Sequence, residues 1–162
     1  MSALRLSAPF GIALLILSLS PLSAGAQANE ALLGKWRLIA AQSKYSPGPV
    51  PKSLILTYAM SGNCLTALAE TVEASGAQTR VEFTCLTPDE REYPVKGSPA
   101  FDSSSYKRVD ALTTAITRKK AGKVVETGTR AVSKDGKTLT ITLQGTSATG
   151  QKYNNVSVYE KS

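Results

Sequence analysis

The sequence contains about ten short strand-like runs, and turn residues separate them at regular intervals. Threonine and other β-formers are frequent in these runs. The expected strands cover residues 34–44, 53–60, 64–72, 77–86, 91–96, 104–109, 112–119, 123–133, 137–145 and 152–161. Because short links join antiparallel neighbours and closure removes exposed edges, we predict an all-β antiparallel up-and-down meander closed into a barrel of about eight to ten strands. A two-sheet sandwich is the alternative, and the lack of a long crossover makes it less favoured.

Residues 1–28 have the pattern of a signal peptide. Arg5 supplies a short positive region, an apolar run extends from Phe10 to Leu19, and small residues end at an A-x-A cleavage site, Ala26-Gln27-Ala28. The apolar run is too short to cross a bilayer core, which requires roughly twenty residues. We therefore expect a periplasmic or secreted protein with one mature domain, residues 29–162, and no integral membrane segment after cleavage.

The chain contains no histidine, so the commonest general base and the commonest zinc ligand are missing. Triads that depend on imidazole are excluded, and we expect no enzymatic activity, no cofactor and no metal site. The acidic cluster Asp89, Glu90 and Glu92 is best interpreted as a solvated turn, because Arg91 lies among the carboxylates. The net charge is +7, but the basic residues are scattered, which argues against a nucleic acid partner.

The two cysteines, Cys64 and Cys85, both lie in the expected mature part, and an exported chain meets an oxidising compartment. A four-residue turn over residues 73–76 would pair Val72 with Ala77. That register sets Cys64 directly opposite Cys85, at a separation that permits a bridge. We therefore predict a disulfide, which would contribute about 3 kcal/mol by the chain-entropy relation.

The last three strands also predict a register. Asp135-Gly136 indicates a tight hairpin, with either a two-residue primed turn or a three-residue turn and a glycine bulge. The next turn, residues 147–150, would set Ile141 against Val156 and leave one aliphatic face. The candidate lumen residues for a bound ligand are Phe83, Ile116, Leu139, Ile141 and Val156.

Three short motifs near the ends of the chain resemble those of the calycins. They are Leu33-Gly34-Lys35-Trp36-Arg37-Leu38, Asp135-Gly136-Lys137-Thr138-Leu139 and Val158-Tyr159-Glu160-Lys161. Within that group they are similar to intracellular fatty-acid-binding proteins, which begin with a G-x-W strand and end in an R-x-Y-E-K-like strand. As a whole, the chain also resembles small exported bacterial lipocalin-like proteins that have no assigned ligand. The resemblance implies a β-barrel and a small apolar or amphipathic ligand.

Two features depart from the fatty-acid-binding pattern. Ser157 stands where that family has an arginine that grips a carboxylate, and a serine cannot make a charge-assisted bidentate contact. The proline-rich segment 46–51 replaces the family's portal helices, and it is either a lid over a pocket or a stiff connector. The phases also conflict, because the family's final tyrosine faces the lumen whereas our register puts Tyr159 on the threonine-rich face.

The resemblance further implies structural roles for Gly34 and Trp36. In lipocalins the tryptophan fills the closed end of the barrel, often beneath an arginine from a late strand. Arg130 is the candidate for that arginine, with cation–π stacking as the physical basis. The alternative is that Trp36 is ordinary core and Arg130 is solvated.

These observations predict a monomeric, exported, lipocalin-like barrel that binds a small apolar or amphipathic molecule. The alternative is a periplasmic protein-binding barrel, such as a protease inhibitor or an envelope assembly factor. In that case the short arm from Asn29 to Leu32 would enter a partner protein. A filled barrel with a projecting arm would favour the alternative.

Overall fold

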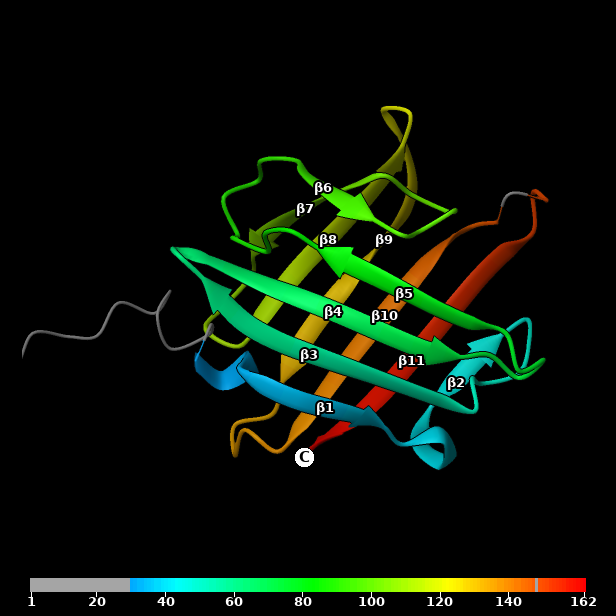
Figure 1. The fold of residues 1–162 in the computed structure, drawn as a ribbon, viewed down its shortest axis with the longest axis horizontal. Helices are drawn as coiled ribbons and strands as arrows, with labels where there is room; N and C mark the ends of the chain where they lie inside the picture. The colour runs from blue at the N-terminus through cyan, green and yellow to red at the C-terminus, as the bar shows by residue number, and fades with distance from the viewer. Residues whose placement is uncertain (1–29, 148) are drawn as a thin grey trace, which may run out of the picture.

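A computed structural model describes residues 30–147 and 149–162, which form an all-β barrel (Figure 1). The predicted signal peptide, residues 1–28, lies outside the described residues. The strands are β1 (Gly34–Leu38), β2 (Lys44–Ser46), β3 (Ser53–Ser61), β4 (Cys64–Val72), β5 (Gln78–Phe83), β6 (Tyr93–Lys96), β7 (Ser103–Arg108), β8 (Thr113–Lys120), β9 (Lys123–Val132), β10 (Thr138–Thr146) and β11 (Lys152–Lys161). A helical turn covers residues 30–32, and a 3-10 helix, η1 (Ala40–Gln42), separates β1 from β2. Within the described ranges, no helix has the length and apolar character needed to cross a membrane.

The strands form one antiparallel sheet that closes on itself. Its order is β1-β3-β4-β5-β6-β7-β8-β9-β10-β11-β2, and β1 also pairs with β11. The predicted antiparallel barrel is confirmed, and the two-sheet alternative is wrong. The predicted first strand, residues 34–44, is interrupted, because β1 leaves β11 after Leu38 and β2 returns to the same strand after η1.

The ladders around the barrel differ in length. β10 and β11 pair over nine positions, whereas β6 pairs over two positions with β5 and over two with β7. β6 is therefore held in the wall by far fewer backbone hydrogen bonds than its longer neighbours (Figure 1).

Three-residue loops that end in a glycine connect β4 to β5 and β10 to β11. In the first loop, the Glu73 N–H donates to the Ala77 carbonyl, and Gly76 has a φ of 94°. In the second, the Ser147 N–H donates to the Gln151 carbonyl. Glycine adopts a positive φ without the steric cost that other residues incur, so both loops require it at their last position. The four-residue turns predicted at these places are wrong.

The shorter loop shifts the register of the last hairpin by one residue from the prediction. Ile141 lies opposite Ser157, and Leu139 lies opposite Tyr159, so the predicted pairing of Ile141 with Val156 is wrong. Because side chains alternate along a strand, Val156 lies on the outer face of the barrel, and Tyr159, which is 3% exposed, lies inside. The conflict of phase with the fatty-acid-binding pattern disappears in this register.

The hairpin at Asp135-Gly136 has neither of the predicted loop lengths. The Ser133 N–H donates to the Thr138 carbonyl, which leaves four residues between them. Asp135 Oδ1 accepts hydrogen bonds from the Ser133 hydroxyl and from the Lys137 N–H. These side-chain bonds stabilise the longer loop, and they lower the pKa of Asp135.

The end of the barrel beside the helical turn 30–32 is filled by apolar side chains, and we call it the closed end. Trp36 is completely buried, and its indole Nε1–H donates to the Leu32 carbonyl over 2.8 Å. Leu65 and Leu139 are also completely buried. Gly34 begins β1 with a φ of 106°, which explains the need for glycine beside this tryptophan.

The cation next to Trp36 is Lys161, whose Nζ lies 5.2 Å from the ring centre. The predicted stacking of Arg130 on Trp36 is not found. Arg130 is nevertheless buried, since its guanidinium carbon lies 5.6 Å from the ring centre of Tyr58 and 5.5 Å from that of Tyr106.

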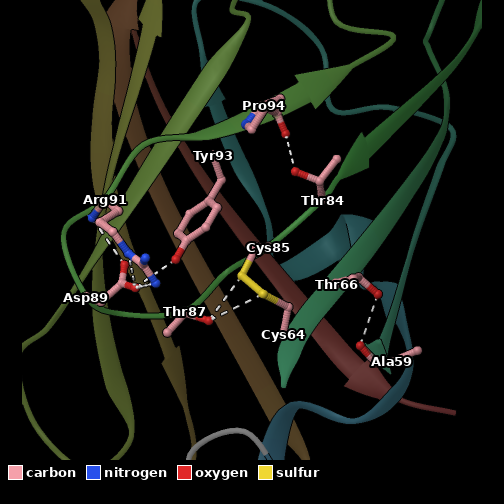
Figure 2. Close-up of a disulfide and its surroundings, with 10 residues drawn as sticks. All are labelled: Ala59, Cys64, Thr66, Thr84, Cys85, Thr87, Asp89, Arg91, Tyr93 and Pro94. Atoms are coloured by element: carbon pink, nitrogen blue, oxygen red, sulfur yellow. Dashed lines mark hydrogen bonds and ion pairs between the residues drawn. A yellow bond between two sulfur atoms is a disulfide. The ribbon is translucent and has the colours of Figure 1, made fainter. Parts of the chain in front are cut away.

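The predicted disulfide between Cys64 and Cys85 is confirmed (Figure 2). Its Cα atoms are 5.2 Å apart. The β4–β5 ladder, in which Ala67 lies opposite Phe83, has a register one residue away from the predicted one, so the predicted direct opposition of the cysteines is wrong. The Thr87 hydroxyl lies 3.1 Å from the Cys85 sulfur, which fastens the chain beyond β5 to the bridge.

Candidate functional site

A cavity of about 590 Å³ opens at the end of the barrel opposite the closed end, and we call this end the mouth. The segment after β2, the β6–β7 connection, the β8–β9 hairpin and the β10–β11 hairpin surround it (Figure 1). The lining residues are Pro47, Pro99, Ala100, Phe101, Lys120, Val125, Glu126, Thr146, Ser147, Gln151, Tyr153 and Asn155. Apolar walls with a few converging polar groups are typical of sites for small molecules.

Glu126 and Tyr153 form the floor of the mouth cavity, and Arg118 pairs with Glu126 below that floor. Arg118 of β8 lies directly opposite Glu126 of β9, and its Nη1 is 2.5 Å from Glu126 Oε2. The Tyr153 hydroxyl donates to the other carboxylate oxygen over 2.6 Å. The two charged side chains are only 13% and 8% exposed. Arg118 therefore compensates the charge of Glu126, and Tyr153 bonds the second carboxylate oxygen.

Two phenylalanine rings hold the guanidinium group of Arg118. Its Cζ lies 4.4 Å from the ring centre of Phe101 and 5.1 Å from that of Phe83. The two rings are stacked with their centres 6.2 Å apart. Cation–π attraction therefore adds to the ion pair in holding the Arg118 guanidinium group between the mouth cavity and the barrel interior, and we call the Arg118–Glu126 pair the partition.

The tyrosines around the mouth remain protonated at neutral pH. Burial raises the pKa of Tyr153, and its hydrogen bond to the Glu126 carboxylate raises the pKa further. Burial also raises the pKa of Tyr45, whose hydroxyl lies 2.7 Å from the Ser157 hydroxyl. The polar groups that border the cavity are thus hydroxyls and amides, the Glu126 carboxylate that Arg118 and Tyr153 engage, and the ammonium group of Lys120.

The proline-rich segment 46–51 reaches the mouth, where Pro47 lines the cavity. Its first residue is tied to β11, because the Ser46 N–H donates to Asn155 Oδ1 over 3.3 Å. The Ser46–Pro47 peptide bond is cis. The segment therefore occupies the position expected of a lid, and a hydrogen bond anchors one end of it.

Most of the predicted lumen residues lie below this floor. Phe83, Ile116 and Ile141 line a small interior cavity of about 30 Å³, and Leu139 is fully buried at greater depth. Val156 lies on the outer face, because of the shift in register. These five side chains do not border the larger cavity at the mouth.

Sequence reasoning missed the residues of the mouth, namely Phe101, Arg118, Glu126 and Tyr153. A signal was present for two of them, because a charged pair at inward positions of adjacent strands indicates a buried contact. Whether Tyr153 faces inward could be read only from the register of β10 and β11, and the predicted register was wrong by one residue. Phe101 lies in a connection whose path no periodicity predicts.

The acidic cluster lies outside the mouth and consists of surface ion pairs. Asp89 bonds Arg91 and Tyr93, and the hydrogen bond from Tyr93 is the main reason why the pKa of Asp89 falls to about 2 (Figure 2). Glu90 pairs with Lys107, and Glu92 pairs with Lys119. The predicted solvated turn describes this segment well.

Comparison with known proteins gives structural matches. No protein-family model and no curated protein matches the sequence. Zebrafish ileal bile acid-binding protein, solved with cholic acid, is 16% identical with a TM-score of 0.51, over 82% of this chain and 99% of that chain. Rv2717c from M. tuberculosis is 15% identical with a TM-score of 0.52, over 90% of this chain and 99% of that chain. The chain therefore has the calycin fold, a closed antiparallel barrel of ten strands with one extra strand, as in lipocalins and fatty-acid-binding proteins.

Proposed function

We propose that this protein is an exported binding protein whose ligand is a small amphipathic molecule held in the mouth cavity. The observation that carries the proposal is the cavity of about 590 Å³ with apolar walls and a polar floor. Its volume falls within the range of about 300–1,000 Å³ that is usual for small-molecule sites. The interior cavity of about 30 Å³ is too small for such a ligand.

The distribution of side chains supports an amphipathic ligand over a purely apolar one. Phe101 and Val125 offer apolar surface to a ring or an alkyl group. Each oxygen of the Glu126 carboxylate accepts one hydrogen bond from the protein and retains a lone pair for a hydroxyl or amide donor of the ligand. A ligand with an apolar body and a neutral donor matches both parts of the site.

Export is supported by the signal-like residues 1–28 together with the disulfide, which is typical of oxidising compartments. N-terminal sequencing of the protein recovered from the periplasm or the medium of a bacterial host should begin at Asn29. Recovery of the full-length chain in the cytoplasm alone would contradict export.

The binding proposal is tested with a polarity-sensitive fluorescent dye and the variant Val125→Arg. A charged side chain in the apolar wall should weaken dye binding by roughly tenfold or more, which corresponds to 1.4 kcal/mol. Val109→Arg is the matched control, because Val109 is 60% exposed and does not line the mouth cavity. Circular dichroism confirms that both variants are folded. Equal dye affinity in the two variants would contradict a site at the mouth.

A protein-binding barrel was expected to have a filled interior and a projecting arm; the interior is nearly filled, but the described part of the arm does not project. Leu32 is 3% exposed and belongs to the core, and the Ala31 carbonyl accepts a hydrogen bond from Lys161 Nζ. The described part of the arm therefore packs on the barrel and contributes to its stability.

A further inference from the structure

The barrel interior contains an arginine whose charge no carboxylate neutralises. Arg130 is 3% exposed, and none of the ion pairs within residues 30–147 and 149–162 includes it. The rings of Tyr58 and Tyr106 flank its guanidinium group. Cation–π contacts weaken the cost of burying a cation but leave its charge in place, so Arg130 requires a further partner.

Two unpaired N–H groups lie around one small cavity. The Nε atoms of Arg118 and Arg130 are buried and have no hydrogen-bond partner in the described part of the chain. Both arginines line the interior cavity of about 30 Å³, which Tyr58 and Tyr106 also line. A buried donor without a partner is destabilising, and two of them at one cavity indicate a common acceptor.

The side chains of the interior do not supply the missing negative charge. The carboxylate of Glu126 is already engaged by Arg118 and Tyr153. Burial raises the pKa of Tyr106, so this tyrosine stays neutral near pH 7. A water molecule would accept the N–H groups but would leave the charge of Arg130 uncompensated.

We propose that the interior cavity binds one small monovalent anion of halide size, held between the Nε–H groups of Arg118 and Arg130. The size follows from the volume, since about 30 Å³ holds one or two water-sized particles and no ring or alkyl chain. The anion completes the charge balance of the interior. This site lies below the Arg118–Glu126 partition, so it is separate from the mouth cavity and does not depend on the function proposed there.

Bromide is the direct probe of this site, because its anomalous scattering identifies it in a crystal. Crystals of the wild-type protein soaked in sodium bromide should show an anomalous peak within hydrogen-bonding distance of both Nε atoms. Density at that point without an anomalous signal would identify water and would overturn the proposal, as would an empty cavity.

Thermal unfolding in sodium chloride and in sodium gluconate at equal ionic strength provides a second measurement. Chloride should raise the melting temperature by roughly 5 °C once its concentration exceeds the Kd about tenfold, because it binds only the folded state. The variant Arg130→Met should lose this difference between the two salts. Arg80→Met is the matched control, since the Arg80 side chain is 61% exposed, and it should keep the full difference. Equal melting temperatures of the wild-type protein in both salts would count against the site, even where Arg130→Met fails to fold.

Discussion

The closed end and the mouth have different kinds of side chain at the inward-facing positions of the same strands. At the closed end the inward positions hold fully buried apolar groups, such as Trp36 and Leu139, next to a disulfide. At the mouth the inward positions hold Glu126 and Tyr153, which border open space, and Arg118, which pairs with Glu126 below them. The closed end buries apolar surface and excludes water, whereas the mouth keeps a shaped surface that water or a ligand can reach.

This difference indicates where stability and function lie in the molecule. Burial of large apolar side chains contributes most of the stability of a small domain, and the closed end contains the largest of them. A partly buried ion pair contributes little net stability but fixes the positions of its groups. Substitutions at the two ends should therefore separate loss of folding from loss of binding.

Alkaline unfolding is the largest expected effect, because buried tyrosines lie at both ends of the barrel. Burial raises the pKa of Tyr106, Tyr153 and Tyr159 above the ordinary value of 10.0. Below pH 10 these tyrosines are protonated in the folded and in the unfolded state, so their contribution to the free energy of unfolding is present in full. Above pH 10 the unfolded state loses protons that the folded state keeps, and stability falls.

The measurement is the ultraviolet absorbance of tyrosinate, followed together with circular dichroism as the pH rises. Tyrosinate from the buried side chains should appear only as the β-sheet signal disappears. Complete titration near pH 10 with an intact β-sheet signal would show that these tyrosines are accessible to water.

Trp36→Ala is the largest expected effect of a single substitution at the closed end. Deleting a fully buried tryptophan typically costs about 3–5 kcal/mol, from lost burial and the cavity left behind. Urea unfolding measures the change in the free energy of unfolding. Val124→Ala is the control, because Val124 is 57% exposed, and it should change stability by less than about 0.5 kcal/mol. Similar losses in the two variants would refute the placement of Trp36 in the core.

Tyr153→Phe should have the smallest effect and should act at the mouth. It removes the hydroxyl that donates to Glu126 but keeps the ring, and the net loss of one such hydrogen bond is about 1 kcal/mol. Affinity for the dye should change more than the melting temperature does, since Tyr153 lines the cavity. A large loss of stability with unchanged dye affinity would place the main role of Tyr153 in the core.

The fold could be predicted from local signals in the sequence. Most strand positions, the order of the long strands and the partnership of Cys64 with Cys85 follow from alternation, turn residues and cysteine count, whereas the break between β1 and β2 was not predicted. The register could not be predicted, because one loop residue decides it and three- and four-residue loops both accept a glycine near their end. Because the loop between β10 and β11 is one residue shorter than predicted, Ser157 lies on the inner face in place of Val156.

The candidate site was harder to predict than the fold, for a physical reason. Its floor joins side chains from β8, β9 and β11 with Phe101 from a connection, and such contacts depend on the three-dimensional path of the chain. Arg130 illustrates the same limit. From the sequence, Arg130 could lie in the interior or in solvent. The packing of Tyr58 and Tyr106 around its guanidinium group shows that it lies in the interior.

The short ladders of β6 determine where the wall of the barrel is easiest to open. β6 pairs at two positions with each neighbouring strand and makes two further hydrogen bonds, from Val95 N–H to the Asp102 carbonyl and from the Thr84 hydroxyl to the Pro94 carbonyl, whereas β10 and β11 pair at nine positions. The connection that follows β6 carries Phe101 over Arg118. We therefore expect the wall at β6, beside the mouth, to open more easily than the wall at β10 and β11.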